Sequence, residues 1–268
     1  MSRACGVVLL IVTAILLGKP SGASARPLRV MSLDQCADQF VLALAPDAEL
    51  ALSPRADDPD SWMAAAAQGV RRVRPTLEAA TGFRPEVVVR YWGGDARLLA
   101  TLERDGVRTV TIADATDMDG VRANIRLVAA GLRHSERGER LVEHMNGRLL
   151  EAQQAGQGRS AVYLTAGGFT SGPGSLMDAV LRAAGFRNAV ARPGYQPLGV
   201  ERILLHPPAL VVRGFFDLAR SDWRGSGRHP AVARIMARRA SASLPGAALT
   251  CPAWFAADGA ALLAAQTR

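Results

Sequence analysis

The side chains that could perform chemistry in this chain do not form a catalytic set. His134 and His144 lie ten residues apart in a helical stretch and so face different directions, and His206 and His229 each precede a proline. Ser175 ends a Gly-Pro-Gly-Ser stretch, but the glycine that follows the serine of a nucleophile elbow is missing. With no nucleophile beside a base and no metal cluster, the sequence predicts a protein that binds and is not an enzyme.

Aromatic, hydroxyl and amide side chains gather instead where the predicted strands end. In open α/β folds, ligands bind outside the carboxyl ends of the strands. Several aromatic rings that converge there suit a large, flat or amphipathic ligand. The predicted ligand-binding residues are Asp34, Gln35, Tyr91, Trp92, Thr170, Ser171, Tyr195, Arg213, Phe215 and Trp254. We expect them to face a common cleft.

The elements that must position these residues alternate between short apolar, β-branched runs and longer helical stretches. Strands are expected at 28–33, 87–89, 109–112, 161–165 and 210–213, with a short one near 247–250. Helices are expected at 34–44, 62–68, 76–80, 96–105, 176–184, 199–204, 230–238 and 255–266. The alternation predicts an α/β fold with mainly parallel sheets.

The middle of the chain interrupts this alternation. Residues 118–157 hold no strand-like run and no proline, and their apolar side chains recur at helical spacing. We expect one long helix, or two nearly collinear helices, joining an N-terminal lobe at 26–117 to a C-terminal lobe at 158–268. The lobes echo each other, because a short helix and a following strand at 76–89 have counterparts at 199–212.

The first 25 residues have the pattern of a cleavable secretory signal. Arg3 precedes an apolar run from Val7 to Leu17, and small residues at 23–25 suit a signal peptidase. The apolar run is too short to span a bilayer, which needs about 20 residues. We therefore expect cleavage near Ala25 and a periplasmic location.

Charge and cysteine content narrow the function further. The formal net charge is +8, but the arginines are dispersed among acidic residues, so nucleic acid is not an expected partner. Beyond the signal, only Cys36 and Cys251 remain. In an oxidising compartment we expect this pair to form a disulfide, with two free buried thiols as the alternative. A disulfide would place the first strand–helix unit beside the last one.

The order of these motifs resembles the periplasmic binding proteins of ABC importers for cobalamin, ferric siderophores and haem, in which a rigid helix joins two lobes. The resemblance covers essentially all of residues 26–268. It rests on the segments 29–33, 84–89 followed by Gly93-Gly94, 169–172 and 251–255, taken in their order around the long helix.

The resemblance implies capture of a metal chelate without chemistry, followed by docking on a permease dimer in the inner membrane. In that family each lobe presents a glutamate to the permease, and these look like Glu78 and Glu201. Tyrosine stands at Tyr91 and Tyr195 where the cobalamin-binding member would have tryptophan, and Arg213 suits an anionic chelate. We expect a monomer without a cofactor of its own, any iron or cobalt arriving with the ligand.

Other functions stay open at this point. A secreted α/β hydrolase would need a nucleophile with a base, for which Ser175 is the residue to test. A zinc or manganese receptor of similar shape would need about three histidine or carboxylate ligands from both lobes. A binding protein that serves a sensor instead of an importer would share the same architecture.

Overall fold

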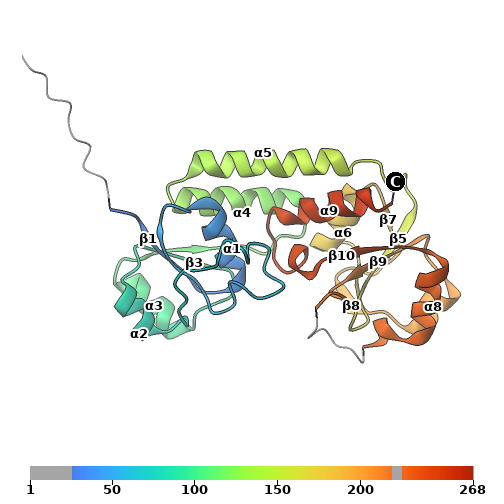
Figure 1. Cartoon of the computed structure of the whole chain (residues 1–268), viewed down its shortest axis with the longest axis horizontal. Helices are drawn as coiled ribbons and strands as arrows, with labels where there is room; N and C mark the ends of the chain where they lie inside the picture. The colour runs from blue at the N-terminus through green and yellow to red at the C-terminus, as the bar shows by residue number, and fades with distance from the viewer. Residues whose placement is uncertain (1–25, 219–224, 268) are drawn as a thin grey trace, which may run out of the picture.

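The structure is a computed structural model that describes residues 26–218 and 225–267. Two α/β lobes lie side by side, and a layer of helices runs along both of them (Figure 1). The expected signal at 1–25 lies outside the described residues. No helix in the described part of the chain combines the length and the apolar character needed to cross a membrane.

The N-terminal lobe is built on a parallel sheet in the order β2-β1-β3-β4. Its strands are β1 Arg29–Ser32, β2 Glu49–Ala51, β3 Val87–Arg90 and β4 Arg108–Thr111, and its helices are α1 Gln35–Leu44, α2 Leu77–Phe83 and α3 Ala96–Arg104. Alternate strand residues enter two cores, as a pleated strand requires: Val30 joins the core that contains Phe40, and Met31 joins the core that contains Leu98. The buried run in β3 therefore reflects a sheet covered on both faces.

The C-terminal lobe has a second parallel sheet, in the order β10-β9-β5-β7. Its strands are β5 Ser160–Thr165, β7 Arg187–Asn188, β9 Leu210–Gly214 and β10 Ala240–Leu244. Its helices are α6 Leu176–Ala183, α7 Val200–Leu205 and α8 Pro230–Arg238, with 3₁₀ turns at Ser226–Arg228 and Gly246–Ala248. A separate antiparallel pair, β6 Phe169–Ser171 with β8 Tyr195–Pro197, is added to this lobe.

The two sheets share one topology. Numbered along the chain within each lobe, both sheets have the order second, first, third, fourth strand. The similar segments at 76–89 and 199–212 form equivalent elements of the two lobes. α2 with β3, and α7 with β9, are the helix and the third strand of their lobes. In each lobe the order reverses between the first and third strands, where ligands of open α/β sheets bind.

The prediction of one long helix, or of two collinear helices, is wrong. The segment folds into two antiparallel helices, α4 Met118–Gly131 and α5 Ser135–Ala152, which lie side by side in Figure 1. The chain reverses at Arg133, whose φ is 64°. An ion pair joins Arg126 to Glu139 at 2.8 Å, and Gly138 allows close packing because a Cβ there would lie 2.5 Å from the Cβ of Ala129.

The last helix ties the lobes together. Helix α9, Phe255–Ala265, packs along α5, and Arg148 of α5 pairs with Asp258 of α9 at 2.8 Å. Phe255 packs in the core of the N-terminal lobe, whereas Leu263 packs in the core of the C-terminal lobe. A disulfide between Cys36 and Cys251 joins α1 to the segment before α9, the link expected from the sequence.

Two smaller predictions are also wrong. The strand expected near 247–250 is a 3₁₀ turn at Gly246–Ala248, and the last strand is β10 instead. Four of the five residues of β10 are alanine or serine and none is β-branched, so its parallel pairing with β9 defines it. The helix expected at 62–68 is a series of turns.

Candidate ligand-binding site

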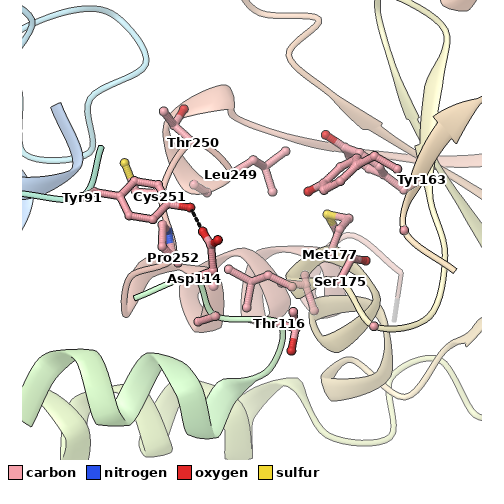
Figure 2. Close-up of a pocket in the computed structure, with 18 residues that line it drawn as sticks. Tyr91, Asp114, Thr116, Tyr163, Ser175, Met177, Leu249, Thr250, Cys251 and Pro252 are labelled. Atoms are coloured by element: carbon pink, nitrogen blue, oxygen red, sulfur yellow. Dashed lines mark hydrogen bonds between the residues drawn. The ribbon is translucent and has the colours of Figure 1, made fainter. Parts of the chain in front are cut away.

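A cavity of about 350 Å³ lies between the lobes. Figure 2 shows Tyr91 and Asp114 on one side of it, with Tyr163 and Met177 across from them. The other lining residues are Ala115, Thr116, Gly174, Ser175, Leu176, Val180, Gly194, Tyr195, Ala248, Leu249, Thr250, Cys251, Pro252 and Ala256. Both lobes and the segment before α9 therefore contribute to one site.

All three tyrosines of the chain line this cavity. Tyr91 follows β3, Tyr163 lies within β5, and Tyr195 begins β8. Burial raises the pKa of Tyr91 and of Tyr163 above the ordinary value, so both phenols stay protonated at neutral pH. Gly214 makes room for Tyr163, because a Cβ at Gly214 would lie 2.5 Å from the Tyr163 hydroxyl. The walls thus combine aromatic faces with neutral hydroxyl groups.

Asp114 is the charged residue among the described residues that line the cavity with these tyrosines. It follows β4, and the Tyr91 hydroxyl donates a hydrogen bond to its Oδ1 (Figure 2). The raised pKa of Tyr91 has a second cause here, after burial, in the hydrogen bond to Asp114 and the charge of that carboxylate. Asp114 was not among the residues predicted to bind ligand, although it follows the fourth strand of the sheet, where ligand contacts are expected.

Asp34 does not line the cavity, but its hydrogen bonds hold the loop that carries a lining residue. Its buried carboxylate caps α1 by accepting from the Ala37 N–H, and its Oδ2 accepts from the backbone N–H groups of Tyr91 at 2.7 Å, Trp92 at 3.1 Å and Gly93 at 2.9 Å. Gly93 is required there, since a Cβ would lie 2.2 Å from the carbonyl oxygen of Leu33. Asp34 therefore fixes the loop that carries Tyr91.

The hydroxyl of Ser175 is already engaged. It donates to the carbonyl of Gly172 at 2.7 Å and accepts from the Asp178 N–H at the start of α6, and Ser171 donates to it. Its contacts are those of an N-cap, and none is to a general base. Ser171 and Ser175 thus form a buried hydroxyl pair at the edge of the site.

The other residues predicted to bind ligand lie outside the cavity lining. Gln35 is buried and donates to Asp60 and Ser61. Thr170 is fully buried, and its hydroxyl has no hydrogen-bond partner within the described residues. Trp92 is 59% exposed.

The predicted residues near the end of the chain also lie outside the lining. Arg213 and Phe215 stand at the end of β9, as expected, but do not line the cavity. Trp254 is 4% exposed because it packs edge-on against Phe40 and Phe255. Of the predicted set, the structure brings Tyr91 and Tyr195 into the cavity.

The two predicted docking glutamates occupy equivalent places in the lobes. Glu78 lies in the first turn of α2 and Glu201 in the first turn of α7, and both are exposed. Hydrogen bonds from its own backbone N–H and from the Thr76 side chain lower the pKa of Glu78 below the ordinary value, so it is charged at neutral pH. Within the described residues, no group of three or more His, Cys, Asp or Glu side chains is placed to hold a metal ion.

Two lobes of one topology with a ligand-sized cavity between them define a class of protein, the two-lobed binding proteins. A family model described as "periplasmic binding protein" matches residues 39–245, and the chain belongs to this family, as the sequence predicted. Members of the family are substrate-binding proteins that work outside the cytoplasm with ABC importer permeases. No curated protein matches the chain.

Solved structures share the fold at low sequence identity. The periplasmic haem-binding protein HutB of Vibrio cholerae has a TM-score of 0.71 and 16% identity, covering 89% of this chain and 98% of that chain. The haem-binding protein RhuT of Roseiflexus sp. RS-1 has a TM-score of 0.69 and 20% identity, covering 90% and 98%. The vitamin B12-binding protein BtuF of V. cholerae has a TM-score of 0.62 and 20% identity, covering 90% and 98%.

Proposed function

We propose that this protein is the periplasmic ligand-binding component of an ABC importer for a metal chelate: cobalamin, a ferric siderophore or haem. The observation that carries the proposal is the cavity between the lobes, lined by every tyrosine of the chain. Aromatic faces with hydroxyl edges suit a large amphipathic ligand that must be held and released unchanged. The ligands named for HutB, RhuT and BtuF belong to this chemical class.

The proposal includes export by the signal at 1–25 and docking through Glu78 and Glu201. These carboxylates are exposed, one on each lobe, and exposed ion pairs orient a complex more than they tighten it, which leaves release possible. The α5–α9 packing and the Cys36–Cys251 disulfide join the lobes, so we expect only a small closure on binding.

Ligand binding is tested by titrating the mature protein with cyanocobalamin, haem and ferric siderophores while tryptophan fluorescence is recorded. Trp92, exposed beside Tyr91, is the expected reporter, and Trp92→Phe identifies its signal. Tyr91→Ala should weaken binding about tenfold or more, whereas Phe169→Ala, an exposed aromatic outside the cavity lining, should not. Failure of every chelate to bind at micromolar concentration would refute the proposed function.

Docking is tested separately, with the permease in liposomes. Glu78→Arg with Glu201→Arg should abolish ligand-dependent transport and leave ligand affinity unchanged. Glu103→Arg, an exposed glutamate on α3, is the matched control and should transport normally. Normal transport by the double charge reversal would contradict the docking role.

A further inference from the structure

We propose that Asp114 makes the cleft select metal chelates that present a neutral or positively charged face over those that present carboxylates or other anionic groups. The inference rests on the proposed function and narrows its ligand class. It runs against the overall charge of +8, which by itself favours an anionic ligand. The charge that a ligand meets inside the cleft, however, is set by the few groups that line it.

The geometry places a carboxylate at the wall. Asp114 follows β4 and lies with Tyr91 on one side of the cavity, facing Tyr163 and Met177 (Figure 2). Its Oδ1 accepts from the Tyr91 hydroxyl, and its Oδ2 makes no hydrogen bond within the described part of the chain. A carboxylate oxygen is therefore left for a ligand group.

The partner of Asp114 also presents an acceptor. The Tyr91 hydroxyl donates its hydrogen bond to Asp114, so the phenol oxygen can only accept a hydrogen bond from a ligand. Burial, the hydrogen bond to Asp114 and the nearby carboxylate all raise the pKa of Tyr91, so the phenol keeps its proton at neutral pH and adds no charge of its own beside Asp114. Together they attract a cationic metal centre or a donor group, and they repel an anion.

The remaining described lining does not offset this charge. It consists of tyrosine, hydroxyl-bearing, glycine, proline and apolar side chains together with the disulfide-bonded Cys251. Arg213, which was predicted to bind an anionic chelate, lies outside that lining. Asp114 is exposed, and a ligand carboxylate placed beside it would meet repulsion that grows as the ligand displaces water from between the two groups.

The test uses pairs of chelates that share a frame and differ in charge. These pairs are aquacobalamin with cyanocobalamin, ferrioxamine B with its N-acetylated form, and haem dimethyl ester with haem. Within any pair that binds, the less negative member should bind the wild-type protein about tenfold more tightly per unit charge. Asp114→Asn should bring that ratio close to one, while Asp114→Glu should retain it.

Glu103→Gln is the matched control, because it removes the same charge from an exposed helix position outside the lining and should leave the ratio at its wild-type value. Circular dichroism establishes that each variant is folded. Binding that prefers the more negative member, or a ratio that Asp114→Asn does not change, overturns the inference and leaves the proposed function standing. Absence of binding by every pair refutes the proposed function itself.

Discussion

Replacing both cysteines of the Cys36–Cys251 disulfide by alanine removes a covalent link between the lobes. Cys36 lies on α1 of the N-terminal lobe, and Cys251 lies in the segment that lines the cavity before α9. Both are buried, so alanine keeps the sites apolar. The contacts of Trp254 and Phe255 with the N-terminal core stay in place, and the double variant should fold.

The size of the effect follows from the loop that the disulfide closes. The cysteines are 215 residues apart, and a cross-link over so long a loop restricts the unfolded chain by about 5 kcal/mol in the chain-entropy account. Residual structure in the unfolded chain reduces this value, because an already compact chain gains less freedom. We expect the double alanine variant to lose about 3 to 5 kcal/mol of unfolding free energy.

Urea denaturation measures this loss, with tryptophan fluorescence reporting the N-terminal core, where Trp62 stacks on Phe255 and Trp254 contacts Phe40. Far-ultraviolet circular dichroism reports both lobes. Without the link, the two signals should separate, since each lobe has its own core. Wild-type protein treated with dithiothreitol in denaturant should refold to match the variant. A loss below about 1 kcal/mol would refute the reasoning.

Three further predictions concern single residues. Burial raises the pKa of Asp38 from 3.8 to about 6, so the ionised form destabilises the fold; unfolding free energy should fall by about 2 kcal/mol as pH rises from 4 to 7, and Asp38→Asn should abolish that fall. Asp34→Ala leaves the N–H groups around Tyr91 without their acceptor and should cost at least about 3 kcal/mol in urea denaturation, with weaker ligand binding. Gly138→Ala should be about 2 kcal/mol less stable than Gly147→Ala on the same helix, where a Cβ meets nothing within 4 Å; equal stability of the two would contradict close α4–α5 packing.

The parallel sheets were predictable because their central strands are buried on both faces. Val87–Val89 and Leu210–Val212 are continuous apolar runs, and they became the third strand of each lobe. The short edge strands β2, β7 and β10 carry no such run and exist through pairing with a neighbour. The sequence did not predict the chain reversal at Arg133, because helical periodicity continues on both sides of it. The turn is fixed by the packing of α4 against α5.

The candidate site was predictable only where a polar or aromatic residue follows a strand. Tyr91 does so, and it lines the cavity. Tyr163 lies inside β5 and has the pattern of a core residue, so its hydroxyl at the cavity wall depends on the space left by Gly214. Trp254 was expected at the cleft, but it packs in the core against Phe40, which lies more than two hundred residues away in sequence. Contacts of that range leave no local signal.

The two lobes are alike in topology and unlike in what they present to the cavity. The N-terminal lobe contributes the hydrogen-bonded pair of Tyr91 and Asp114, and the buried Asp34 holds the backbone of Tyr91. The opposite side is mainly apolar, with Met177 and Leu249 beside the Tyr163 ring. A ligand with one polar and one apolar face would therefore bind in a single orientation, polar face toward the N-terminal lobe. The repeated strand order builds the cleft, and the differences between the loops at its two sides determine what the cleft selects.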